Sequence, residues 1–138
     1  MAAPGNQFCQ RRLVAQLPQL FDAARAAGSP VEAWIDVPQG QLPGVLSRET
    51  YRIVQEAVTN LLRHAPGRPI TVRIAVRDGG LELRCVNATD GGGRSRASGG
   101  KGLRGIRERA TLLGGEATAA RQDDEWVLAV RLPLRLGA

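Results

Sequence analysis

The sequence has few cysteines and no long apolar run. Its 138 residues contain 2 cysteines, Cys9 and Cys85, which lie far apart and in no CxxC pair. Neither a disulfide framework nor a cysteine metal site is therefore indicated, and a reducing, cytoplasmic compartment fits best. No stretch of about 18 apolar residues is present, so we expect no membrane span. The first twelve residues lack the apolar centre of a secretory signal.

Aromatic residues are also scarce, at 4% of the chain, and Lys101 is the only lysine. Arginine supplies the remaining positive charge, and the formal net charge of +6 favours anionic partners. A nucleic-acid groove usually combines clustered basic residues with aromatic stacking platforms, whereas the arginines here are scattered. We therefore expect no nucleic-acid partner. The remaining alternatives are a small anionic ligand and arginines that simply solvate the surface.

An apolar content of 43% suits one compact domain, which we assign to residues 17–138, with residues 1–16 as an N-terminal extension or linker. Apolar periodicity and breaker residues predict the elements in chain order. They are a helix at 17–27, a strand at 31–37, a helix at 48–65, strands at 70–76 and 81–86, a loop at 88–100, a helix at 103–113 and strands at 116–121 and 125–133. This order predicts an α/β sandwich, with helices on one face of a mixed, mostly antiparallel sheet.

Three local signals set the expected boundaries. Ser47 precedes the long apolar stripe and is a plausible N-cap for the 48–65 helix. The Asp78-Gly79 pair between two strands is a strong hairpin signal. Gly114 and Gly115 follow the last apolar residue of the 103–113 helix and are expected to close it.

The 48–65 helix has polar residues at helical spacing. Glu56 and Asn60 are four residues apart, and Arg63 is seven beyond Glu56, so all three are expected on one side, with Arg52 one turn earlier. An amide oxygen can ligate Mg²⁺, a carboxylate can orient or deprotonate a nucleophile, and a guanidinium can hold phosphate. An ordinary solvated helix face is the alternative interpretation.

Two further features suit a nucleotide. Gly100, Lys101, Gly102 and Leu103 lie where the Gly-rich loop becomes a helix, and backbone N–H groups at such a junction bind anions. Asn87 ends the 81–86 strand, where a short polar side chain can recognise a base edge. A ligand-free hinge and a turn-forming asparagine are the corresponding alternatives.

Taken together, these blocks resemble a known family. YRIVQEAVTNLLRHA (51–65) resembles the N box of the GHKL ATPase superfamily, and more narrowly that of histidine kinases paired with helix-turn-helix response regulators. GKGLRGIRERATLLGG (100–115) resembles their second glycine box, and LELRCVN (81–87) falls where their first glycine box begins. The resemblance covers about residues 17–134.

The resemblance implies the Bergerat α/β fold and ATP and Mg²⁺ as cofactors. It implies that Asn60 ligates the metal, that Glu56 is the catalytic base or polarising group, and that Arg63 contacts phosphate. Residues 88–101 would form a lid over the nucleotide, shaped by Gly100 and Gly102. Further nucleotide contacts would come from Asn87, Lys101, Leu103 and, within the lid, Arg94 and Arg96.

The sequence departs from the family pattern at two positions and lacks one element. Asn87 stands where the family has an aspartate that accepts a hydrogen bond from the adenine amino group, and a neutral amide is the weaker acceptor. Lys101 stands where these kinases often have histidine. The only histidine, His64, lies inside the N box and in no acceptor motif. We therefore expect the phosphoacceptor histidine on a dimerisation domain that is separate or missing here.

The resemblance implies three functions that remain open. The first is a sensor kinase catalytic domain, which phosphorylates the dimerisation domain of the same kinase and serves a response regulator indirectly. The second is a stand-alone GHKL anti-sigma-factor kinase acting on serine or threonine. The third is a non-catalytic signalling module that only binds nucleotide, and Asn87 is the feature that favours it.

Overall fold

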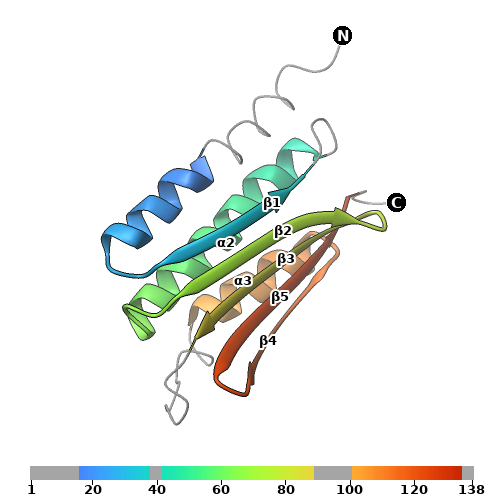
Figure 1. Cartoon of the computed structure of the whole chain (residues 1–138). Coiled ribbons are helices and arrows are strands. Elements are labelled where there is room, and N and C mark those ends of the chain that lie inside the picture. Colours follow the sequence, from blue (N-terminus) through green and yellow to red (C-terminus); the bar gives the residue numbers. More distant parts are fainter. Residues whose placement is uncertain (1–15, 38–41, 89–100, 135–138) are drawn as a thin grey trace.

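The computed structural model describes residues 16–37, 42–88 and 101–134 (Figure 1). Most of the predicted N-terminal extension and most of the predicted lid, including Arg94, Arg96 and Gly100, lie outside these ranges. Their predicted roles remain predictions. Ala88 belongs to a strand and Lys101 to a helix, so the segment between these two elements is 89–100.

Five strands form one sheet, in the order β1-β2-β3-β5-β4. Their bounds are Val31–Asp36 for β1, Ile70–Arg77 for β2, Gly80–Ala88 for β3, Glu116–Gln122 for β4 and Glu125–Pro133 for β5. β1 pairs with β2 in parallel, and the β2–β3, β3–β5 and β4–β5 pairs are antiparallel. The mixed, mostly antiparallel sheet that the sequence predicts is confirmed.

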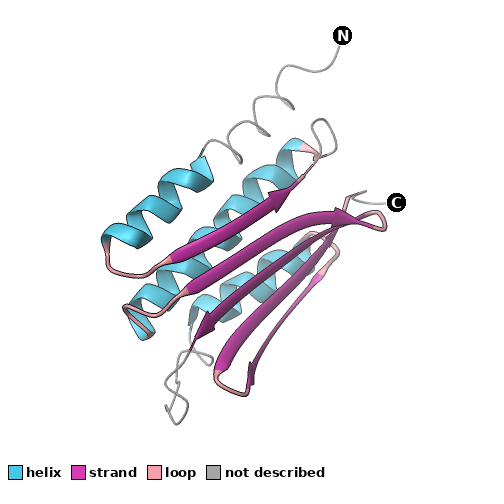
Figure 2. Cartoon of the chain, in the orientation of Figure 1, coloured by secondary structure: helices cyan, strands magenta, loops and turns pink. Residues whose placement is uncertain are grey.

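In Figure 2 the two later helices lie behind this sheet, and the first helix lies beyond its β1 edge. The helices comprise residues 16–26, α2 (Gly44–His64) and α3 (Lys101–Leu112). Because side chains alternate along a strand, one face of each strand points toward the helices and its residues form the core. On β2 these are Ile70, Val72 and Ile74, all at most 1% exposed. None of the helices described is long and apolar enough to cross a membrane.

The predicted start of the long helix is wrong by several residues. α2 begins at Gly44, with Pro43 as its N-cap residue, and the Ser47 N–H already donates a helical hydrogen bond of 3.0 Å to the Pro43 carbonyl. Ser47 is fully buried inside the first turn. The earlier start places Leu46 in the core at 0% exposure, and Pro43 is tolerated because an N-cap position needs no N–H donor.

The predicted turns are found where the sequence places them. Asp78 and Gly79 both have positive φ, at 49° and 73°, as the tight β2–β3 hairpin requires. At the end of α3, Gly114 has φ 81°, and the Gly115 N–H donates to the Ala110 carbonyl at 2.8 Å. This is the Schellman closure that turns the chain from α3 into β4.

Candidate functional site

The Glu56 side chain lies against α3. Arg109 of α3 donates from Nε to Glu56 Oε1 at 3.1 Å and from Nη1 to Glu49 Oε1 at 3.1 Å. The three side chains are 22–30% exposed. Burial by itself lowers the pKa of Arg109, but the hydrogen bonds to the two carboxylates more than offset this, so its pKa is raised. A charged guanidinium therefore joins α3 to two positions of α2 that are about two turns apart.

Gly105 forms the other side of the Glu56 position. A Cβ on Gly105 would lie 3.0 Å from Glu56 Oε2. Gly105 and Arg109 are one helical turn apart, so one face of α3 approaches both carboxylate oxygens. The absence of a side chain at residue 105 leaves the room that this carboxylate occupies.

Asn60, one turn beyond Glu56, is 7% exposed. Such a sheltered polar side chain is not part of an ordinary solvated helix face, so that interpretation does not hold for Asn60. Arg63, in the last turn of α2, is exposed. The three residues share a side of the helix but range from buried to exposed.

Asn87 lies near the end of β3, on the helix-facing side, and is 1% exposed. Its Nδ2 donates to the Pro69 carbonyl at 3.1 Å, and the Ala88 N–H donates to the same carbonyl at 3.2 Å. The side-chain nitrogen is therefore used within the protein, while Oδ1 remains an acceptor. An aspartate at this position has no hydrogen to give Pro69, so the asparagine matches its surroundings.

The first turn of α3 contains Lys101, Gly102 and Leu103, two residues earlier than the sequence predicts. The backbone N–H groups of a first turn have no helical partner, and this turn contains no acidic residue. The Leu103 side chain is 4% exposed and belongs to the core. Its predicted nucleotide contact is thus restricted to the backbone.

These parts lie at one end of the molecule. Figure 1 shows the C-terminal end of α2, the end of β3 and the start of α3 close to one another. Asn60, Asn87 and Lys101 come from these three ends. The segment 89–100, which connects β3 to α3, leaves and re-enters the described chain at this same end.

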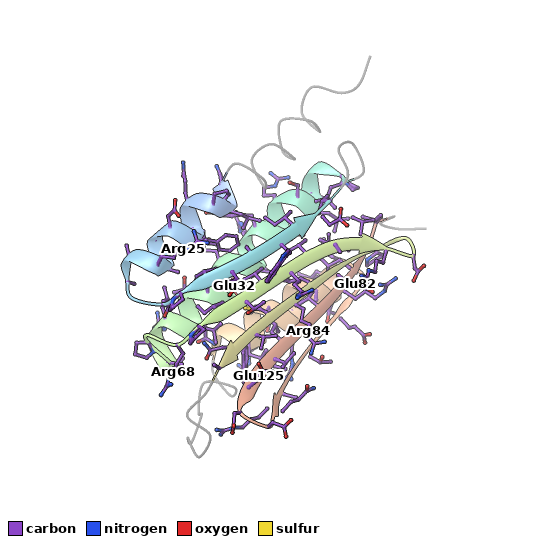
Figure 3. All side chains as sticks on the ribbon, viewed as in Figure 1. Arg25, Glu32, Arg68, Glu82, Arg84 and Glu125 are labelled. Carbon is purple, nitrogen blue, oxygen red and sulfur yellow. The ribbon has the colours of Figure 1, made fainter. Side chains whose placement is uncertain are left out.

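A concavity of about 600 Å³ lies elsewhere, on the sheet face turned away from the helices, called here the open face. Figure 3 shows Glu82 and Arg84 on this face. Trp34 and Arg73 also line it, and the Arg73 guanidinium lies 4.5 Å from the Trp34 ring centre. None of the predicted nucleotide residues lines this concavity, so it is distinct from the site behind the sheet.

The described side chains do not form a metal site by themselves. Among the residues that the structure describes, no group of three or more His, Cys, Asp and Glu is close enough to hold a metal ion. Mg²⁺ commonly binds through one or two protein ligands, with water and substrate phosphates completing its octahedron. A single amide such as Asn60 fits a metal that arrives with a nucleotide.

Sequence reasoning missed the partners of the predicted residues. Arg109 and Gly105 lie within the block that resembles the second glycine box, but no role was inferred for them. A glycine in the middle of an amphipathic helix is the signal that was available, because it usually has a packing reason. Pro69, which orients Asn87, gave no signal of its own.

No family model matches the chain. Among curated proteins, it is 28% identical to the sensor histidine kinase LiaS of Bacillus subtilis over 102 residues, which are 73% of this chain and 28% of LiaS. It is 33% identical to the sensor histidine kinase YxjM of the same organism over 109 residues, which are 78% of this chain and 24% of YxjM. The chain thus spans about a quarter of the length of these relatives.

Solved structures agree on the fold. The catalytic domain of histidine kinase ThkA superposes with a TM-score of 0.70 at 12% identity, covering 91% of this chain and 94% of that domain. At this identity the likeness establishes the α/β fold, and the sequence relatives add the family. Together they place this chain among the GHKL-type catalytic domains of sensor histidine kinases.

Proposed function

We propose that this chain binds Mg²⁺–ATP between α2 and α3 and transfers the γ-phosphoryl group to a histidine on the dimerisation domain of the same kinase. From there the phosphoryl group would pass to a response regulator. The sensor-kinase names of the relatives support this activity. The proposed compartment is the cytoplasm, because the kinase would meet ATP and its regulator there.

The observation that carries the proposal is Asn60. Its side chain is 7% exposed and lies on α2, one turn from Glu56. An amide with so little access to water is stabilised by a partner other than water. A metal-bound phosphate group supplies one, because the amide oxygen is a good ligand for Mg²⁺.

The other residues have complementary roles in this proposal. Arg63 is exposed at the end of α2 and would contact phosphate. The first turn of α3, from Lys101 to Leu103, would present backbone N–H groups to the phosphates, and Gly100, which precedes it in the sequence, would do the same. Asn87 would accept a hydrogen bond from the adenine amino group through Oδ1. Mg²⁺, when bound, would neutralise charge on the phosphates.

Glu56 would be the catalytic base. Its carboxylate would hold or accept the proton of the acceptor imidazole, so that the unprotonated ring nitrogen attacks phosphorus. The bond to the leaving oxygen of ADP breaks as the bond from nitrogen to phosphorus forms. The surrounding helices would exclude water, which competes with histidine as the nucleophile.

Calorimetric titration tests nucleotide binding. We expect saturable binding of Mg²⁺–ATP and Mg²⁺–ADP that weakens when EDTA removes the metal. Asn60→Ala should weaken Mg²⁺–ATP binding at least about 10-fold, whereas the exposed neighbour in Thr59→Ala should leave it unchanged. The absence of saturable binding at millimolar nucleotide would contradict the proposal and favour the non-catalytic module.

A second experiment identifies the acceptor. The chain is mixed with labelled ATP and the dimerisation domain of the same kinase, and the labelled product is treated with acid. Phosphohistidine is acid-labile and phosphoserine is stable. Acid-stable label would favour the anti-sigma-factor kinase over the sensor kinase.

A further inference from the structure

One face of α3 approaches both oxygens of the Glu56 carboxylate. Arg109 Nε donates to Oε1 at 3.1 Å, and the position of a Cβ on Gly105 is 3.0 Å from Oε2. Gly105 and Arg109 are spaced by one turn, so the same helix face supplies a donor to one oxygen and space for the other. The hydrogen bond from Arg109 and the space at Gly105 therefore favour one orientation of the carboxylate.

The contacts of Arg109 and Gly105 with Glu56 go beyond what is needed to join α3 to α2. Arg109 already joins α3 to α2 through Glu49 at 3.1 Å, and Glu49 is also 3.9 Å from Arg52. A glycine inside a helix costs about 1 kcal/mol relative to alanine. The nearest side-chain atom to a Cβ at residue 105 belongs to Glu56. A link through Glu49 alone would not require that space.

From this geometry we infer that Arg109 is a positioning residue for phosphoryl transfer, which holds the Glu56 carboxylate in one orientation against Gly105. The inference rests on the proposed role of Glu56 as the base. Arg109 acts only through Glu56 and contacts neither nucleotide nor acceptor. Its two donors are in a rigid fork, which lysine lacks, so a lysine can reach only one of the two carboxylates at a time.

The test is a double-mutant cycle on Glu56 and Arg109, measured as the single-turnover rate of transfer to the dimerisation domain at saturating Mg²⁺–ATP. Arg109→Gln should lower the rate about 10-fold or more while the ATP dissociation constant changes less than about 2-fold. In the Glu56→Gln background, Arg109→Gln should cause no further loss, because the group that it positions is gone. Arg109→Lys should recover part of the rate.

Two controls separate positioning from stability. Glu49→Gln removes the other partner of the same guanidinium and should leave the rate near that of the unmodified chain. Arg107→Gln removes an exposed arginine from the same helix and should do the same. Thermal unfolding of every variant establishes that each is folded at the assay temperature.

The possible outcomes distinguish a failure of this inference from a failure of the proposed kinase function. Equal losses from Arg109→Gln with and without Glu56, or equal losses from Glu49→Gln and Arg109→Gln, would overturn the inference and leave the kinase function intact. A folded Arg109→Gln variant with the full rate would do the same. A full rate in Glu56→Gln would instead remove the base role itself, and the inference with it.

Discussion

The Asn87 side chain and the Pro69 carbonyl are joined by a hydrogen bond of 3.1 Å in which Nδ2 is the donor. Pro69 also accepts the Ala88 N–H at 3.2 Å, so its carbonyl receives two donors at the end of β3. The contact determines which end of the Asn87 amide faces the protein. An ionised aspartate at this position would have no hydrogen to donate to Pro69.

Asn87→Asp should therefore destabilise the protein, although it restores the residue usual in the family. It removes the donor to Pro69 and buries a carboxylate, at a cost of about 1–3 kcal/mol. Urea unfolding at pH 7 measures the loss. The loss should shrink toward about pH 4, where the protonated carboxyl group can donate to Pro69. Unchanged stability together with tighter ATP binding would contradict this account.

Gly105→Ala should slow phosphoryl transfer while leaving the stability of the fold nearly unchanged. The new methyl group would lie 3.0 Å from Glu56 Oε2, so the carboxylate must shift, while alanine favours the helix by about 1 kcal/mol. We expect a change in unfolding free energy of less than about 1 kcal/mol and a slower phosphoryl transfer. Adding Gly105→Ala to Glu56→Gln should not slow transfer further. An unimpaired rate in the single variant would show that the space at residue 105 is not needed.

Because the Cys85 thiol is buried, we expect the free energy of unfolding to fall at alkaline pH. Burial raises its pKa from 9.0 to about 12, so the folded state keeps the proton after the unfolded state has released it. Its contribution is complete below about pH 9 and falls by about 1.4 kcal/mol per pH unit from there toward pH 12. The difference in unfolding free energy between pH 7 and pH 10 should be smaller in Cys85→Ala. An identical pH dependence in both proteins would exclude this contribution.

Gly115→Ala should be among the more damaging single changes in the fold. Its Cβ would lie 2.0 Å from the Arg131 carbonyl oxygen, which belongs to the backbone of β5 and cannot rotate away. We expect a loss of about 2–4 kcal/mol, measured by chemical denaturation. Gly67→Ala is the control: it has open space but φ 81°, and should cost only about 1–2 kcal/mol. Gly115 is not among the glycines with positive φ, so a loss at residue 115 no larger than that at residue 67 would contradict the steric explanation.

Most of the fold was predictable from local patterns. Apolar periodicity indicated the strands and helices because each buries a regular stripe, and Leu103, Ile106 and Ala110 are buried as that pattern requires. The start of α2 was not predictable from a capping signal. Ser47 resembles an N-cap, but the need to bury Leu46 starts the helix at Gly44. Tertiary packing overrode a local preference.

The site was predictable in its parts and not in its contacts. Glu56 and Asn60 stood out because helical spacing is a local property. The bond between Glu56 and Arg109 joins residues 53 positions apart, and the bond between Asn87 and Pro69 joins residues 18 apart. Such pairings depend on how α2, α3 and the strands pack. A single sequence contains no direct signal of that packing.

The uneven covering of the sheet has a practical consequence. The helices cover one side only, so a fluorophore or surface tether attached through a Thr118→Cys substitution, on the open face, is separated from the proposed catalytic side chains by the sheet itself. That separation is on the order of 10 Å, the usual spacing between packed layers. Immobilised or dye-labelled protein prepared in this way should keep free access for its substrates, which suits single-molecule measurement of turnover.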